Sequence, residues 1–269
     1  MNAIDFEYDS HYLSDFGFII CSFDGSSGVE NVSVGSEISF NTVPMRQGRH
    51  FGLTSAVYEN CIEAEFDIMK DACLSSDIQE ISDAEFRHIM RWLNRREFLP
   101  FRFIEEDDDF NNRYYDASFN IEKITVDDKL YGVKLKMITN SPFGYGEDIK
   151  FIWDADPDSQ MIVQDMSDEI GDTFPVLKIT MKESGDLYLR NETIGRQTLI
   201  KNCTINEVIT IDNKHQIVST DRETHKIYND FNFIFFKIVN TLDERDNEIT
   251  ASLHCTIELT YSPIIKDGV

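Results

Sequence analysis

The segment SDAEFRHIMRWLNRREFLPFRF, Ser82 to Phe103, contains the one clear helix pattern in a chain otherwise made of strand patterns. Ser82 and Glu85 have the spacing of a capping box, in which two residues satisfy each other's backbone N–H groups at the start of a helix. The apolar residues that follow recur at i, i+3, i+4 and i+7, which places them on one helix face: Phe86, Ile89, Met90 and Leu93. Pro100 then marks the change into the strand-like FRFIEE. The segment therefore predicts a helix, a short turn and a strand.

The same helix carries a basic stripe that is separate from its apolar face. Arg87, Arg91 and Arg95 recur every four residues, so they lie along one line of the helix surface. The whole chain has only 25 Lys and Arg against 49 Asp and Glu, which makes this cluster unusual. Such a stripe would suit a catalytic groove, a nucleic-acid-binding surface or a contact between subunits. Trp92, which lies among these arginines, is expected to be a core residue or the anchor of an interface.

The acidic composition limits what the chain binds. Its formal net charge is -24, whereas contacts to nucleic-acid phosphates or anionic lipid need Lys and Arg, so neither sequence-specific nucleic-acid binding nor membrane insertion is expected. The longest apolar clusters, FGFII and FIFFKIV, are too short to cross a bilayer as a helix, and no signal peptide is visible. A hydrophobic content of 41% is sufficient for a packed core.

Strand patterns surround the helix in the first half of the chain. From Cys61 to Met69 the apolar residues point one way, whereas Glu63, Glu65 and Asp67 point the other. This alternation predicts a half-buried strand with an acidic outer face. A hairpin is predicted from Tyr115 to Asn140, and a further strand is predicted at SEISFNTVP.

We place a domain boundary near residue 148, after the turn-like SPFGYGED, which gives domains of residues 1–148 and 149–269. Beyond the boundary, short strand patterns, NFIFFKIV among them, alternate with turn sequences such as KESGD and LDERDN, and no helix pattern occurs. This spacing is typical of a β-sandwich. The predicted fold class is mainly β, with a sandwich-like N-terminal domain that has one α-helix, followed by a C-terminal β-sandwich.

The search for catalytic and metal-binding motifs is negative, so we predict a protein that is not an enzyme, with no catalytic residue, no cofactor-binding residue and no metal ligand. Asp154, Asp156, Asp158 and Asp165 have part of the spacing of a calcium loop, but the turn glycine is missing, and a solvated linker is the preferred interpretation. The acidic run at residues 105–109 is interpreted as a charged loop between strands.

The order of segments resembles the distal tail protein family of long-tailed phages. In the first half the resembling pieces are, in order, SDFGFIICSFDG, VPMRQGRHFG, the helix and strand from Glu85, NRYYDASFNIEKI and KMITNSPFGYG. Met45 stands where that family commonly has a glycine. In the second half, the stretch from Gly171 to Gly195 resembles the opening strands of a galectin-like sandwich, and EVITIDNKHQIV and NDFNFIFFKIVN follow. The chain departs from the family pattern at Lys237 to Asn240, where a Pro-Gly turn is common.

This resemblance implies a structural protein of a phage, prophage or tailocin tail tip. It implies a first domain that forms a homohexameric ring and a galectin-like second domain that projects outward. The implied partners are copies of the chain itself, the tail tube protein and the tail-tip hub or tail-associated protein, with the tape-measure and receptor-binding proteins as further candidates. The implied location is the tip of the virion tail, after synthesis in the cytoplasm of the bacterial host.

The charged faces suggest how copies of the chain could meet. Head-to-tail contacts in a closed ring require two different, complementary surfaces on each subunit. We hypothesise that Arg87, Arg91 and Arg95, with Trp92 beside them, or the acidic face, Glu63, Glu65 and Asp67, contact a neighbouring subunit or the hub; a solvated helix face is the alternative. Six copies at -24 each carry a formal charge of -144, and we expect the part of this charge that lines the ring lumen to repel passing DNA.

Two other classes of function stay open. A sugar-binding face could form from GDLYLRNE and the Phe-rich segment, although buried core aromatics explain both better. The second hypothesis is thus a carbohydrate-binding β-sandwich protein that contacts host cell-wall glycan. The third is a glycosidase that uses a pair of acidic residues, but no pair among the 49 is singled out.

Overall fold

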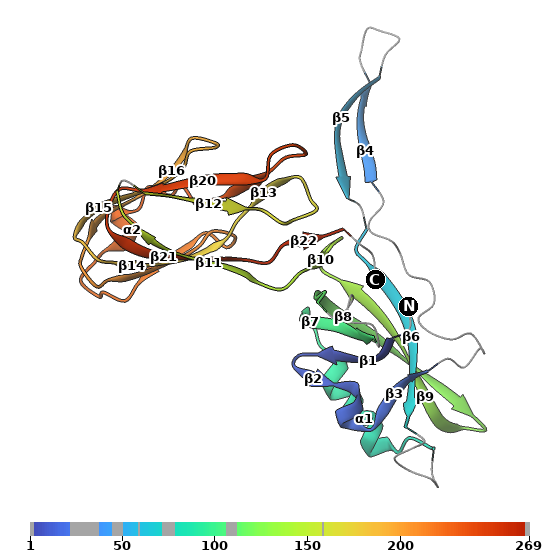
Figure 1. The fold of residues 1–269 in the computed structure, drawn as a ribbon. Helices are drawn as coiled ribbons and strands as arrows, with labels where there is room; N and C mark the ends of the chain where they lie inside the picture. The colour runs from blue at the N-terminus through green and yellow to red at the C-terminus, as the bar shows by residue number, and fades with distance from the viewer. Residues whose placement is uncertain are drawn as a thin grey trace. The chain divides into compact units, whose positions relative to one another are not determined.

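The computed structural model describes residues 3–21, 38–44, 51–58, 60–71, 79–105, 112–157 and 159–266. These residues fold into two compact units, Met1–Gly146 with the end of the chain from Ile265, and Glu147–Ile264. The mainly β class is confirmed, with one α-helix and a β-sheet in the first unit and β-sheets in the second (Figure 1). The loop that contains Met45, most of the acidic run at 105–109, and Asp158 lie outside the described residues.

The N-terminal unit is built on one seven-stranded antiparallel sheet with the order β2-β1-β7-β8-β9-β6-β3. β3, at the edge opposite β2, also contacts β1, so the sheet curls back on itself. The elements of this unit are β1 (Ala3–Tyr8), β2 (His11–Tyr12), η1 (Leu13–Phe16), β3 (Phe18–Cys21), β4 (Ile38–Pro44), β5 (Phe51–Tyr58), β6 (Glu63–Lys70), α1 (Asp83–Leu93), β7 (Leu99–Glu105), β8 (Tyr115–Val126), β9 (Lys129–Thr139) and β10 (Gly144–Tyr145).

An aromatic cluster fills the inner face of this curled sheet. The ring of Phe6 is fully buried. Its centroid lies 5.5–6.2 Å from those of Phe66, Phe101, Phe119 and Trp92, which come from β6, β7, β8 and α1. Aromatic rings bury large apolar areas and favour such offset and edge-to-face contacts, so this cluster holds β1 and these four elements together.

The predicted helix is confirmed as α1, including its capping box. The Ser82 side-chain oxygen accepts a hydrogen bond from the backbone N–H of Glu85, and the Glu85 carboxylate accepts one from the backbone N–H of Ser82. Ile89, Trp92 and Leu93 are buried. Since Trp92 reaches the aromatic cluster, the helix covers the inner face of the sheet.

The predicted strands of this half are also confirmed. β4 matches the strand at SEISFNTVP, and in β6 the residues Glu63, Glu65 and Asp67 point away from the buried face. β8 and β9 form the predicted hairpin. Its turn residues Asp127 and Asp128 both have positive φ, which matches the right-handed twist of a two-residue hairpin.

β4 and β5 form a separate two-stranded sheet, and neither pairs with another strand of the described residues. Ile38 and Phe40 lie on one face of this hairpin, and Tyr58, opposite Ile38, lies on the same face. Val57 lies on the other face. The Tyr58 ring packs edge-on against Phe143, with 4.8 Å between the centroids.

The C-terminal unit is a sandwich of a five-stranded sheet, β11-β21-β14-β17-β18, and a four-stranded sheet, β12-β20-β15-β16, with the pair β13-β19 beside them. Alternate residues of the strands point inward and make one apolar core. Its elements are β11 (Ile149–Ala155), β12 (Gln160–Gln164), β13 (Gly171–Thr173), β14 (Val176–Met181), β15 (Gly185–Asn191), β16 (Arg196–Cys203), β17 (Val208–Asp212), β18 (Ile217–Thr220), α2 (Ile227–Asp230), β19 (Ile238–Asn240), β20 (Asp246–Ala251), β21 (Cys255–Tyr261) and β22 (Ile264–Ile265).

Two features of this unit differ from the sequence prediction. The sequence has no helix pattern in this half, but the structure has a helix of four residues, α2, which is too short to produce one. The strand expected at NFIFFKIV is wrong over most of its length. Only Ile238–Asn240 is a strand there, and it pairs with β13. The departure from the Pro-Gly pattern at Lys237 to Asn240 therefore falls on a short strand, β19.

No helix of the described ranges is both long enough and apolar enough to span a membrane.

Candidate functional site

The basic stripe is exposed on the helix side of the N-terminal unit, but only Arg87 and Arg91 lie on α1. The expectation that Arg95 continues the stripe on the helix is wrong, because α1 ends at Leu93 with Asn94 as its C-cap. The side chains of Arg87 and Arg91 point outward, and neither forms an ion pair with another described residue. Arg95 lies 3.8 Å from the carboxylate of Asp9, a contact at the limit of an ion pair. Two guanidinium groups are therefore available for carboxylates outside this chain, which they can bind in a planar, bidentate geometry.

Trp92 lies beneath the stripe rather than within it. Its side chain is buried, its indole Nε1 donates a hydrogen bond to the Tyr8 carbonyl at 3.1 Å, and its ring stacks on Phe16 with 4.3 Å between the centroids. Trp92 thus positions α1 on the sheet, and the candidate contact surface consists of the arginines above it.

The acidic face of β6 is partly balanced by lysines of the neighbouring strand. Glu65 lies 3.8 Å from Lys134 and 3.7 Å from Lys136, and Lys136 also pairs with Glu122 of β8 at 2.9 Å. Cross-strand neighbours of opposite charge explain this ladder. Because α1 packs on the inner face and this ladder lies on the outer face, the basic stripe and the acidic residues are on opposite sides of the sheet.

Glu63 and Asp67 differ in their surroundings on the same strand. Glu63 is exposed at the start of β6. Asp67 is half-buried and lies opposite Lys134 in the strand register. Of the three predicted acidic residues, Glu63 has the surroundings best suited to a contact with another chain.

An apolar surface on the β4–β5 hairpin was not singled out by sequence reasoning. Ile38 is 50% exposed and Phe40 is 61% exposed, and they share one face of the hairpin with Tyr58. A contiguous exposed apolar face usually marks a contact with another molecule. The alternation of Ile38 and Phe40 is a signal for a half-buried strand, but sequence alone could not show that no second layer covers them among the residues that the structure describes.

The segments considered for sugar binding are mostly buried. In β15 the leucines face the core and Tyr188 faces outward. In the Phe-rich segment, Phe231, Phe235 and Phe236 are buried, as expected for core aromatics, whereas Phe233 is 60% exposed. Phe233 also has a positive φ of 55°, which is a strained conformation for a bulky residue.

The calcium-like aspartates do not converge where the structure describes them. Both oxygens of Asp165, which is fully buried, accept hydrogen bonds, one from the backbone N–H of Ser167 and one from the hydroxyl of Thr173. Asp154 pairs with Lys182. Over the described ranges, no group of three or more His, Cys, Asp or Glu residues is arranged to hold a metal ion.

Comparison with known proteins finds a matching family model for each half of the chain. A family model described as a phage tail protein N-terminal domain matches residues 1–141, and one described as a phage tail C-terminal domain matches residues 143–261. A comparison with curated protein sequences found no match. Among solved structures, the SPP1 Dit (gp 19.1) protein, described as a paradigm of the hub adsorption apparatus in phages that infect Gram-positive bacteria, has a similar fold. Its TM-score is 0.66 at 14% identity, over 96% of this chain and 98% of that chain.

Proposed function

The chain belongs to the phage tail protein family, and from this premise we propose that it is the distal tail adaptor, whose copies close into a ring at the tail tip. The ring is expected to be a hexamer that joins the tail tube to the tail-tip hub and the host-adsorption apparatus. The similar fold of SPP1 Dit supports this role. The observation that carries the proposal is the exposed apolar face of the β4–β5 hairpin, Ile38, Phe40 and Tyr58.

A closed ring needs two different surfaces on each subunit, because every contact is head-to-tail. In this proposal the hairpin face packs on a neighbouring copy and supplies most of the association energy, since burial of apolar area is the main favourable term. The exposed Arg87 and Arg91 on one side of the sheet and Glu63 on the other add charge complementarity. Such rim charges set orientation more than affinity.

The proposed neighbours of the ring are the tail tube protein, the hub or tail-associated protein, and the tape-measure and receptor-binding proteins. The role is structural rather than enzymatic, at the tip of the virion tail, after synthesis in the bacterial cytoplasm. The residue ranges 1–148 and 149–269 serve in this proposal as the ring-forming domain and the outward galectin-like domain.

The first test is the mass of the purified chain in solution and its response to a charge on the hairpin. Native mass spectrometry is expected to show about 187 kDa, which is six times 31.2 kDa. Phe40→Asp should convert the ring to monomers, because a carboxylate in a buried apolar contact costs several kcal/mol. Val57→Asp, on the opposite face of the same hairpin, is the matched control and should leave the ring intact. A monomeric wild-type chain, or identical masses for both variants, would argue against the proposal.

The second test reverses the charge of the helix stripe. The double variant Arg87→Glu/Arg91→Glu should weaken ring assembly about two- to thirtyfold at low salt, because each of the two exposed pairs contributes about 0.2–1 kcal/mol. Lys201→Glu/Arg245→Glu changes the net charge equally at exposed positions of the C-terminal unit and should have no effect. Dissociation measured by light scattering at about 50 mM and about 500 mM salt would show the difference shrinking as salt screens the charges. If both double variants assembled equally well at low salt, the stripe would not be part of the interface.

A carbohydrate-binding role for the C-terminal unit is the second candidate function. The observation that favours it is the pair of exposed aromatic residues Tyr188 and Phe233 on a β-sandwich. Binding to a glycan array that is lost in Phe233→Ala would support it, and such binding is compatible with a ring.

A further inference from the structure

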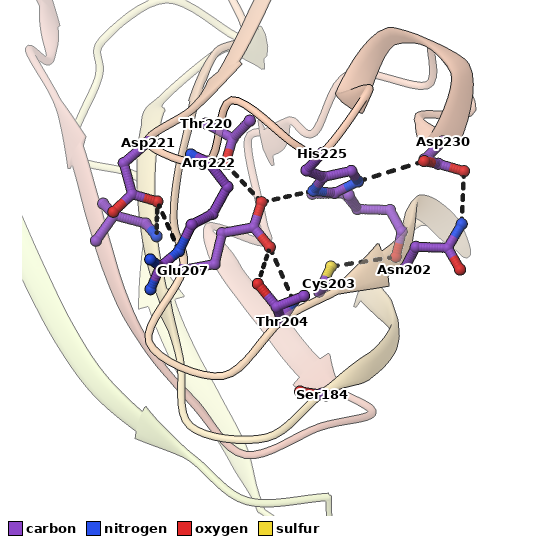
Figure 2. Close-up of polar contacts among 12 residues, drawn as sticks. Ser184, Asn202, Cys203, Thr204, Glu207, Thr220, Asp221, Arg222, His225 and Asp230 are labelled. Carbon is purple, nitrogen blue, oxygen red and sulfur yellow. Dashed lines mark hydrogen bonds and ion pairs between the residues drawn. The ribbon is translucent and has the colours of Figure 1, made fainter.

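A carboxylate–histidine–carboxylate triad, in which the glutamate and the histidine side chains are buried and the aspartate is half-buried, lies in the C-terminal unit (Figure 2). The His225 side chain is 3% exposed, and its Nδ1 lies 2.5 Å from Oε1 of Glu207, which is fully buried. On the other side of the ring, Nε2 lies 3.5 Å from Oδ2 of Asp230. Glu207 comes from the connection between β16 and β17, and Asp230 comes from α2, so the histidine stands between two separate elements.

Glu207 is held in its ionised form. Its Oε2 accepts hydrogen bonds from the backbone N–H of Thr204 at 2.8 Å and from the Thr204 hydroxyl at 3.1 Å, and its Oε1 accepts one from the Thr220 hydroxyl at 2.5 Å. Burial alone would raise the pKa of Glu207, but the hydrogen bonds from Thr220, His225 and Thr204 outweigh it and lower the pKa. Because Oε1 belongs to a carboxylate and can only accept, Nδ1 of His225 carries a proton.

The second ring nitrogen faces another carboxylate. Nε2 has no hydrogen-bond partner and is directed at Asp230, whose other oxygen accepts a hydrogen bond from the side-chain amide of Asn202 at 2.8 Å. A neutral ring with its proton on Nδ1 would direct a lone pair at this carboxylate. Only the imidazolium carries protons on both nitrogens.

The other titratable groups near the triad do not balance its two negative charges. Burial raises the pKa of the Cys203 thiol to about 12, so this group is neutral. Arg222 lies 3.7 Å from Asp221 and donates to the carbonyl of Asn206 at 2.9 Å. Figure 2 shows this arginine beside Asp221, on the other side of Glu207 from the histidine. His225 is therefore the cation that faces both Glu207 and Asp230.

We propose that His225 is a proton-dependent latch, which as an imidazolium bridges Glu207 and Asp230 and fastens α2 to the sandwich. A helix of four residues has no stability of its own, so α2 depends on such tertiary contacts. The residues that follow α2 carry the exposed Phe233. Loss of the proton would leave two facing carboxylates with no cation between them and release this segment.

The latch has limits at both ends of the pH scale. As pH falls through the lowered pKa of Glu207, the carboxylate takes up a proton and its contribution to stability, present above its ordinary pKa, is lost. As pH rises, the imidazolium loses its second proton and the bridge to Asp230 opens. The segment is therefore closed in mild acid and released in alkali.

Hydrogen exchange of the full-length protein tests the proposal. Protection of peptides from residues 226–236, corrected for the intrinsic exchange rate, should fall at least about tenfold between about pH 6 and pH 9, because the ion pair between His225 and Asp230 is lost. In His225→Gln the protection should already be low at pH 6 and should not change with pH. His215→Gln is the matched control, since this histidine is exposed and pairs with Asp212 of its own turn, and it should keep the wild-type profile.

Asp230→Asn provides a second variant if the glutamine variant does not fold. It keeps the shape of the side chain but removes the charge that stabilises the second proton, so the fall in protection should move to lower pH. A wild-type profile that does not change with pH would overturn the latch. Protection that is raised by zinc and lowered by EDTA would also overturn it, and would show that Nε2 and Asp230 bind a metal ion instead.

Discussion

Replacement of Trp92 by alanine is expected to destabilise the N-terminal unit by about 3–5 kcal/mol. The indole stacks on Phe16 and lies 5.6 Å from the Phe6 ring, and its Nε1 donates to the Tyr8 carbonyl. The variant leaves a cavity in the aromatic cluster and an unpaired buried carbonyl. In calorimetry of the full chain, the transition of this unit should fall by about 10 °C or more.

Two further variants separate the causes of this effect. Trp92→Phe keeps an aromatic ring in the cluster and loses the hydrogen bond, so we expect it to cost about a third as much, near the usual 1–2 kcal/mol for one buried polar contact. Trp153→Phe changes the other tryptophan, which lies on β11 of the C-terminal unit, and should leave the transition of the N-terminal unit unchanged. If Trp92→Ala instead left stability unchanged and abolished ring assembly, Trp92 would be an interface anchor rather than a core residue.

Local patterns were sufficient to predict the elements that carry their own signals. The capping box at Ser82, the alternation in β6 and the β8–β9 hairpin all depend on residues close together in sequence. Each signal agrees with the global fold, as expected of a sequence that specifies one structure. The helix α2 has no such signal, because its four residues make only about one turn, which is too short for an apolar pattern to repeat. Its position is fixed by contacts with residues far along the chain.

The candidate site was harder to predict. It depends on which residues face each other across paired strands and on which apolar side chains stay exposed. Glu65 was predicted to face outward, but its lysine partners on β9 follow only from the pairing of two strands that are about 70 residues apart. Phe40 was assigned to a strand, yet its exposure depends on the absence of a second layer over the hairpin among the described residues. His225 lies among polar residues in the sequence, and only the fold brings Glu207 to its ring.

Buried asparagines show the same dependence on the fold, and Asn247 is the strongest case. It lies on β20 and is fully buried. Its Oδ1 accepts hydrogen bonds from the Asn191 side chain and from the backbone N–H of Val239, both at 2.8 Å. Its Nδ2 donates to the carbonyls of Val239 at 2.9 Å and Arg245 at 3.1 Å. The amide thus connects β19 and β20 where their backbones alone do not complete a ladder.

Asn247→Asp should destabilise the C-terminal unit by roughly 3–5 kcal/mol near neutral pH, although it replaces only the side-chain NH2 group by an oxygen atom. The new carboxylate oxygen would face two carbonyls that need a donor, and its charge would be buried without a cation. A buried carboxyl has a raised pKa, so the variant should regain part of the lost stability as pH falls and the carboxyl becomes a donor. Calorimetry at about pH 7.5 and about pH 5 checks the sign, with Gln160→Glu at an exposed position of β12 as control. A loss of stability that is equal at both pH values would show that the packing of β20, and not the two donated hydrogen bonds, is what Asn247 provides.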